Sequence, residues 1–109
     1  MMAPATRARV EANEIKKGDV LAVARFAGAA AARQAALLLP NASFVNEMVI
    51  NIDFEVGDDA IDITARVSSP GAENLAPSAL AAAGVSALTI YDMCKAVDRS
   101  MVVTHLRVR

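Results

Sequence analysis

The stretch Ala79–Val97 reads ALAAAGVSALTIYDMCKAV and decides the fold of this chain. It is apolar almost throughout and ends in a charged cluster, so it is too hydrophobic for a helix that faces water on most sides. At about 3.6 residues per turn, its larger apolar side chains are spread around the helix. They are Leu80, Val85, Leu88, Ile90, Tyr91, Met93 and Val97. The pattern therefore predicts a helix that is buried on more than one side.

Two charged residues stand out on this predicted helix. Asp92 and Lys95 are three positions apart, which places both on one face near the C-terminal end. One interpretation is a solvated ion pair that contributes a few tenths of a kcal/mol to stability. The other is a functional pair of carboxylate and ammonium groups, because active sites also hold such pairs. The spacing alone leaves both interpretations open.

Length and composition limit the class of protein. The 109 residues predict a single domain over residues 1–109. Lys and Arg number 11 against 12 Asp and Glu, so there is no general electrostatic attraction for nucleic acid or an anionic membrane. The hydrophobic content of 55% on so short a chain favours contacts between subunits. No apolar run is long enough to span a bilayer and the first residues lack an apolar signal region, so we expect a cytoplasmic protein.

The first part of the chain predicts a strand followed by a helix. Residues 7–12 alternate between apolar and charged side chains, which is a weak strand pattern. Asp19 can cap a helix over Val20–Leu39, and Pro40 ends it. Gly28 costs about 1 kcal/mol of helix propensity relative to Ala, so it predicts close approach of a neighbouring backbone. The side chains expected to point inward are Val20, Val23, Phe26, Ala27, Ala30, Leu37 and Leu38.

The middle of the chain carries the clearest strand pattern. Residues 48–56 and 61–67 alternate with period two around a turn at residues 57–60, which predicts a hairpin with one buried and one solvated face. Residues 101–108 predict a last strand. The resulting order βαββαβ predicts an α+β, ferredoxin-like fold, in which two helices cover one face of a four-stranded antiparallel sheet.

Two blocks of sequence resemble a known family. Lys17–Gly28 reads KGDVLAVARFAG and Ala87–Val97 reads ALTIYDMCKAV. Both closely resemble signatures of the MoaC family of cyclic pyranopterin monophosphate synthases, and the second matches at every position. The lengths of the predicted elements between the blocks also fit, so the resemblance covers residues 17–108.

The resemblance implies a cytoplasmic lyase of molybdenum cofactor biosynthesis that works without a metal or an organic cofactor. Its reaction rearranges a cyclised GTP derivative into a cyclic pterin phosphate, with loss of pyrophosphate. The family assembles as a hexamer, a trimer of dimers, with active sites between subunits. Of its catalytic residues, the lysine of KGD matches Lys17, and the acid and lysine of YDMCK match Asp92 and Lys95. Such groups can transfer protons or neutralise phosphate.

The chain departs from the family pattern at three substrate positions. Ser43 stands where the family carries a histidine, and Ala76 and Ser78 stand where it carries two glutamates. The serines can hydrogen-bond to a ligand but cannot transfer protons near neutral pH. The family helix before KGD is also expected to be missing, because residues 10–17 are too short to hold it. A second hypothesis is therefore a non-catalytic paralogue that acts as an interaction or regulatory subunit, and a third is a binder of another nucleotide or pterin phosphate.

The single cysteine is interpreted as a structural residue. Cys94 lies on the predicted helix with no histidine near it in sequence, so we expect a packed thiol rather than a nucleophile. No grouping of residues in the sequence predicts a metal site.

Overall fold

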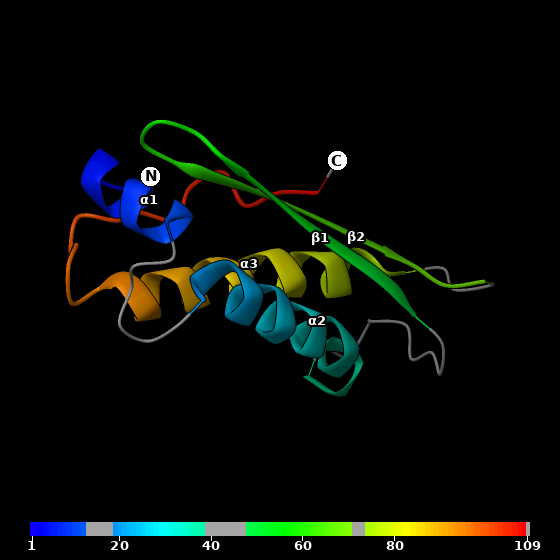
Figure 1. The fold of residues 1–109 in the computed structure, drawn as a ribbon. Coiled ribbons are helices and arrows are strands. Elements are labelled where there is room, and N and C mark those ends of the chain that lie inside the picture. The colour runs from blue at the N-terminus through cyan, green and yellow to red at the C-terminus, as the bar shows by residue number, and fades with distance from the viewer. Residues whose placement is uncertain (13–18, 39–47, 71–73, 109) are drawn as a thin grey trace.

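The computed structural model describes residues 1–12, 19–38, 48–70 and 74–108. Along these residues the elements follow in the order α1 (Pro4–Glu11), α2 (Val20–Leu38), β1 (Val49–Val56), β2 (Ile61–Ser68) and α3 (Ala76–Cys94) (Figure 1). The two long helices lie antiparallel to each other beneath one face of a β-hairpin. The predicted α+β class is confirmed, with helices packed on an antiparallel sheet in a way consistent with a ferredoxin-like arrangement.

The predicted hairpin forms with the expected alternation. β1 and β2 pair antiparallel from Val49 opposite Ser68 to Val56 opposite Ile61. This register places apolar residues opposite one another on the face that meets the helices, as in the pair of Ile52 and Ala65. On the other face, Arg66 donates to the Asp53 carboxylate at 2.9 Å. Because strand side chains alternate between faces, the register fixes which residues reach the core.

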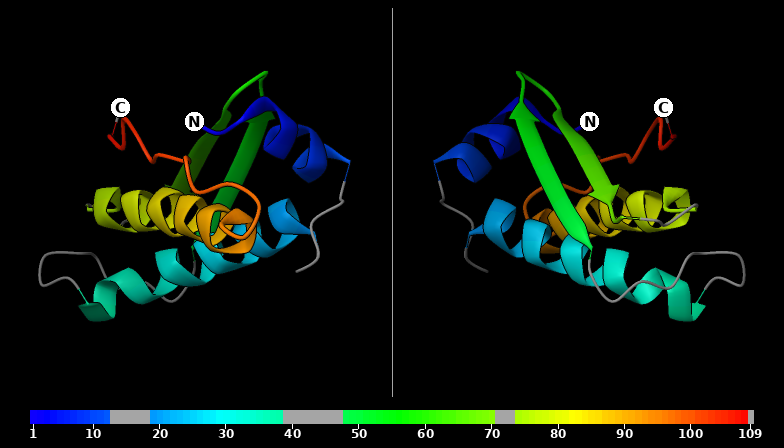
Figure 2. Two further views of the ribbon diagram at one scale, coloured as in Figure 1. Left: turned by 90° about the vertical axis from the view of Figure 1, so that its left-hand side faces the viewer. Right: turned by 90° about the vertical axis from the view of Figure 1, so that its right-hand side faces the viewer.

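The helices α2 and α3 touch most closely at Gly28. A Cβ atom on Gly28 would lie 2.2 Å from Ser86 Oγ and 2.7 Å from the Ala82 carbonyl oxygen, so only glycine fits there. The Ser86 hydroxyl donates to the Ala24 carbonyl at 3.1 Å across the same contact. The side views show the two helices side by side under the strands (Figure 2). The prediction that Gly28 permits close approach of a backbone is therefore confirmed.

The predicted inward face of α2 is largely wrong. Val20 is buried as expected, but Phe26 is 79% exposed, and Val23, Leu37 and Leu38 are also exposed. The close contact at Gly28 admits only small side chains between the helices. The face of α2 that packs inward therefore consists of small residues after its first turn: Ala24, Gly28, Ala32 and Ala35.

The predicted first strand is also wrong, because residues 4–11 form the helix α1. Pro4 stands at the start of this helix, where its fixed backbone angle and missing N–H are favourable. Thr6 and Val10 are buried one helical turn apart, and Arg7 pairs with Glu11 at 2.9 Å. A short alternation of small and charged residues thus fits a helix face equally well. It follows that a helix does precede the KGD block, contrary to expectation.

Residues 101–108 do not form the predicted last strand, and His105 has a positive φ of 56°. They run along α3, where Leu106 lies next to Gly84. Val102 exchanges backbone hydrogen bonds with Met1, at 3.1 Å and 2.8 Å. Among the described residues, the sheet consequently has two strands where the sequence predicted four.

Candidate functional site

The site is built on the C-terminal end of α3. Lys95 Nζ lies 2.9 Å from Asp92 Oδ1, so the predicted ion pair forms. The Lys95 side chain is 49% exposed and that of Asp92 is 64% exposed, which leaves both charged groups open to solvent. Exposed pairs of this kind add little to stability, because water competes for both partners. Because both side chains are exposed, a ligand can reach the carboxylate and the ammonium group.

The helix end fixes the position of Lys95. α3 ends at Cys94, and Lys95 keeps helical backbone angles. The amides of Val97 and Asp98 both donate to the Cys94 carbonyl at 3.0 Å and close a turn over residues 95–97. This turn holds the lysine one helical turn from Asp92, at the spacing that the sequence predicted.

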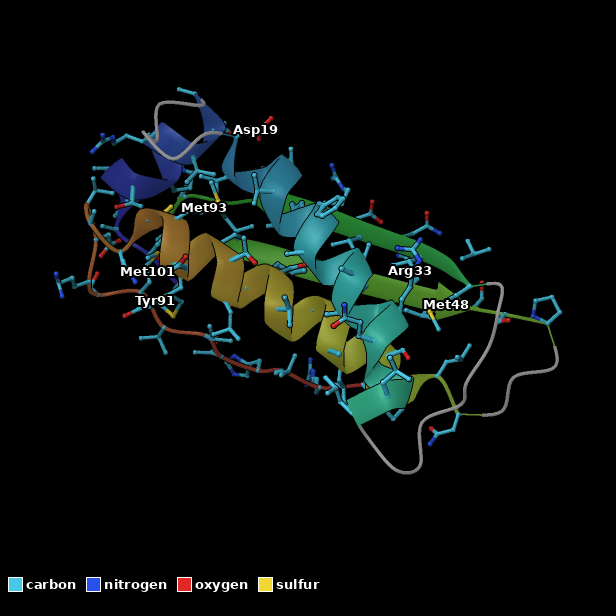
Figure 3. The ribbon with its side chains drawn as sticks, turned by 90° about the horizontal axis from the view of Figure 1, so that it is seen from below. Asp19, Arg33, Met48, Tyr91, Met93 and Met101 are labelled. Atoms are coloured by element: carbon cyan, nitrogen blue, oxygen red, sulfur yellow. The ribbon has the colours of Figure 1, made fainter. Side chains whose placement is uncertain are left out.

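The other predicted site residues do not all fall on this surface. Lys17 and Ser43 lie outside the described residues. Asp19, two positions after Lys17, caps α2 as expected, with its carboxylate accepting from the Ala22 amide at 3.1 Å. Figure 3 shows Asp19 and Met93 at the same end of the helix pair. The start of α2 and the end of α3 thus meet at one end of the molecule.

Ser78 lies far from the ion pair within one chain. It belongs to the first turn of α3 and Asp92 to the last, about 21 Å apart along a helix that rises about 1.5 Å per residue. Ser78 is fully buried, and its hydroxyl has no hydrogen-bond partner among the residues that the structure describes. A buried hydroxyl without a partner is destabilising, so this serine is not a favourable core residue. One subunit by itself does not bring Ser78 and Asp92 together.

Sequence reasoning missed Asp98, the most strongly bonded acid at this end of the molecule. Its carboxylate is only 7% exposed and accepts from the Ser100 hydroxyl at 2.5 Å, the Ala3 amide at 2.9 Å and the Ser100 amide at 2.8 Å. These hydrogen bonds, with one from Thr6, lower the pKa of Asp98 to about 2. The spacing of Asp98 and Ser100 was the available signal, because Asp often bonds the backbone two residues on.

Two residues of the matching blocks serve packing. Burial raises the pKa of the Cys94 thiol and the side chain is fully enclosed, which confirms the expectation of a packed thiol. Arg25 donates to the Ile52 carbonyl at 3.0 Å and lies over the Phe54 ring at 5.2 Å. Arg25 therefore joins α2 to β1 through the free edge of that strand.

The described residues hold neither a metal-ligand cluster nor a membrane-spanning helix. Over residues 1–12, 19–38, 48–70 and 74–108, no three acidic, histidine or cysteine side chains gather as metal ligands would. None of the helices in these ranges has the length and hydrophobicity needed to cross a bilayer.

Comparison with known proteins identifies the family. The MoaC family model matches residues 1–109. The chain is 43% identical to the cyclic pyranopterin monophosphate synthase of Desulforamulus reducens, over 98% of this chain and 66% of that protein. It is 46% identical to the molybdenum cofactor biosynthesis bifunctional protein of Chlorobaculum tepidum, over 98% of this chain and 34% of that protein.

A third relative agrees. The cyclic pyranopterin monophosphate synthase of Limosilactobacillus fermentum is 42% identical, over 96% of this chain and 64% of that protein. The chain thus spans about two thirds of the length of these synthases and a third of the bifunctional protein. With a family model that matches it from end to end, the chain belongs to the MoaC family.

Proposed function

We propose that this chain acts in molybdenum cofactor biosynthesis, as a lyase that forms cyclic pyranopterin monophosphate from a cyclised GTP derivative and releases pyrophosphate. The observation that carries the proposal is the solvent-facing pair of Asp92 and Lys95, 2.9 Å apart within the ALTIYDMCKAV block. Relatives more than 40% identical to the chain bear the name of this synthase, which supports the same activity here.

The residue types suit the proposed reaction. In the proposed reaction the Asp92 carboxylate accepts a proton from the purine-derived ring and Lys95, 2.9 Å away, orients that carboxylate. An ammonium group also balances the charge of the phosphates, and Lys17 supplies a second one from the KGD block. The reaction as proposed needs proton transfer and charge neutralisation, both of which side chains supply without a metal or an organic cofactor.

We further propose a homo-oligomer, a hexamer built as a trimer of dimers, located in the cytoplasm, in which residues 1–109 form one MoaC-like domain. Large apolar side chains left in solvent on both long helices support contacts between subunits: Phe26, Leu37, Leu38 and Leu88. Light scattering of the purified chain tests this, and a monomer at assay concentrations would contradict it.

A single-turnover assay tests the activity. Purified chain in excess over the cyclised GTP derivative is expected to release pyrophosphate and a pterin product, which mass spectrometry identifies. The Asp92→Asn variant serves as the matched control, because it removes the charge from an exposed side chain and keeps its shape. Absence of product from the wild-type chain at high concentration would overturn the proposed activity.

A specific observation favours a second candidate, a non-catalytic paralogue. Ser78 stands at a family glutamate position, yet it is buried, has no hydrogen-bond partner in the described part of the chain and holds no group that transfers protons near neutral pH. Such a chain would act as an interaction or regulatory subunit of a complete homologue. Co-purification of the two would support this candidate, whereas a homo-oligomer that ignores the homologue would exclude it.

The same lysines also suit another phosphate-bearing heterocycle. A thermal-shift panel of nucleotides and pterin phosphates separates this candidate from the others. A ligand present at about 100 times its Kd stabilises a protein by about 2.7 kcal/mol, a shift that is readily measured. A panel without any shift would exclude a nucleotide or pterin binder.

A further inference from the structure

The Asp98 carboxylate connects the turn after α3 with the start of α1 and with the segment at Ser100. Its Oδ2 accepts from the Ala3 amide at the N-terminal end of α1, and its Oδ1 accepts from the amide and the hydroxyl of Ser100. The Thr6 hydroxyl provides a further hydrogen bond from α1. We call Asp98 and these three donor residues the Asp98 clasp. Both carboxylate oxygens are occupied by donors from the protein, so the clasp leaves no oxygen for a ligand.

The clasp closes the turn that carries Lys95. The Asp98 amide donates to the Cys94 carbonyl, and this bond ends the turn over residues 95–97. The side chain of Asp98 then fastens the end of the turn to α1. Lys95 is therefore held from two directions, by α3 before it and by the clasp after it.

The packing of α1 adds to this restraint. Val10 of α1 is buried in one apolar cluster with Met93 and Cys94 at the end of α3. Thr6, the clasp residue one helical turn before Val10, is also buried. A shift of the clasp would therefore move α1 together with the helix end that holds Asp92 and Lys95.

We propose that Asp98 is a positioning residue of the candidate site: through the clasp it fixes the turn after α3 and so holds Lys95 against Asp92. The inference rests on the proposed function, since it assigns Asp98 a role in that site. Asp98 itself does not touch the substrate. Its charge suits the task, because an anion at the start of a helix also interacts favourably with the helix dipole of α1.

The Asp98→Asn variant tests the clasp with almost no change in shape. An amide has one oxygen, whereas N–H and O–H donors face both Asp98 oxygens, so one donor set would meet an NH₂ group instead. The Asp62→Asn variant is the matched control, since it removes the same charge from an exposed position on β2. The Ser100→Ala variant removes a single hydroxyl donor and provides a milder perturbation should Asp98→Asn fail to fold.

Nuclear magnetic resonance of the lysine side chains gives a readout that does not need activity. The chain's lysines are Lys16, Lys17 and Lys95, so the Lys95 amine signal is assigned from a Lys95→Arg variant. In Asp98→Asn we expect this signal to move toward its position in Asp92→Asn, where the pair is broken. In Asp62→Asn it should stay at the wild-type position. An unchanged Lys95 signal in both Asp98→Asn and Ser100→Ala would overturn the proposal.

Kinetics separate positioning from a general loss of stability. Misplacing a catalytic group by about 1 Å costs up to about 10²-fold in rate, so kcat of Asp98→Asn should fall by one to two orders of magnitude. KM should change much less, because the ligand-binding groups are still present. A large rise in KM with unchanged kcat would contradict a positioning role. If the wild-type chain shows no turnover, the proposed activity fails and the lysine signals alone decide the role of Asp98.

Discussion

Asp92 and Asp98 lie six residues apart at the same end of α3, yet their surroundings are opposite. Asp92 is 64% exposed and forms an ion pair with Lys95. Asp98 is 7% exposed, accepts hydrogen bonds at both oxygens and has a pKa of about 2. The first carboxylate is open to solvent, and the second is enclosed by its own chain.

The two carboxylates are therefore suited to different roles at this helix end. A carboxylate whose oxygens are both bonded by the protein holds structure but has no capacity left for a substrate. A carboxylate in an exposed pair adds little to stability and can be reached by a substrate from solvent. We therefore expect that substitutions at Asp92 change activity and that substitutions at Asp98 change stability as well as activity.

The largest effect is expected for Asp92→Asn, which removes the charge of the exposed acid that we propose to be catalytic. Loss of a general acid or base group lowers rates by about 10² to 10⁴-fold, and single-turnover pterin formation should fall by that factor. The melting temperature should stay near that of the wild type, because the side chain is exposed. Retained activity with a lowered melting temperature would reverse the roles assigned to the two acids.

The next effect concerns stability lost away from both acids. In Gly28→Ala the added methyl meets Ser86, Ala82 and Ile52, and overpacking of this kind costs about 1 to 3 kcal/mol. Urea denaturation measures the loss. The control is Gly84→Ala in α3, where the nearest atom, on Leu106, is 3.6 Å away and the gain in helix propensity should stabilise the chain by up to about 1 kcal/mol.

The two glycine variants also separate a loss of stability from a loss of the exposed ion pair. Neither site touches the pair of Asp92 and Lys95, so single-turnover activity should remain wherever the variant is folded. A loss of activity in folded Gly28→Ala that matches the loss in Asp92→Asn would show that activity follows general stability rather than the exposed pair.

The pH dependence of stability provides a smaller test on Asp98. Its folded pKa of about 2 lies below the ordinary value of 3.8, so its contribution to stability is complete above pH 3.8 and is lost as the pH falls toward 2. The free energy of unfolding should therefore fall more steeply across this window in the wild type than in Asp98→Asn. Parallel curves for the two proteins in urea titrations would contradict a contribution of the Asp98 clasp to stability.

The smallest effect is expected for the stability of Lys95→Ala. An exposed pair three residues apart on a helix contributes about 0.2 to 0.5 kcal/mol, so the free energy of unfolding should change by no more than this. Thermal denaturation at low and high salt measures it. A loss well above 1 kcal/mol would place Lys95 with Asp98 among the structural residues and would erase the contrast between the two acids.

Much of the fold was predictable from local patterns. The period-two alternation of residues 48–56 and 61–67 predicted the hairpin, because side chains on a half-buried strand must alternate. The apolar run of Ala79–Val97 predicted the helix, although its buried residues form one stripe and Leu88 and Tyr91 stay exposed. Gly28 predicted the close helix contact. In each case the signal lay within the element itself.

The features that the sequence did not reveal depend on contacts between distant elements. The inward face of α2 is set by how closely α3 approaches, so small alanines pack inside and Phe26 stays outside. The helix α1 stands where a strand was predicted: Val10 packs with the end of α3, and Thr6 hydrogen-bonds to Asp98. Of the candidate site, spacing predicted the pair of Asp92 and Lys95, whereas Asp98 depends on Ala3, 95 positions away in sequence.

The proposed site requires that Lys17 joins Asp92 and Lys95, within a subunit or between subunits. Amine cross-linking tests this requirement. In a Lys16→Arg variant, the remaining primary amines are those of Lys17, Lys95 and the N-terminus. A short amine-reactive cross-linker followed by peptide mass spectrometry identifies a Lys17–Lys95 link by its two peptides and separates it from links to the N-terminus. We predict a Lys17–Lys95 cross-link, in a product of one subunit's mass or of two. Single-ended adducts on both lysines, with no cross-link between them, would contradict the claim.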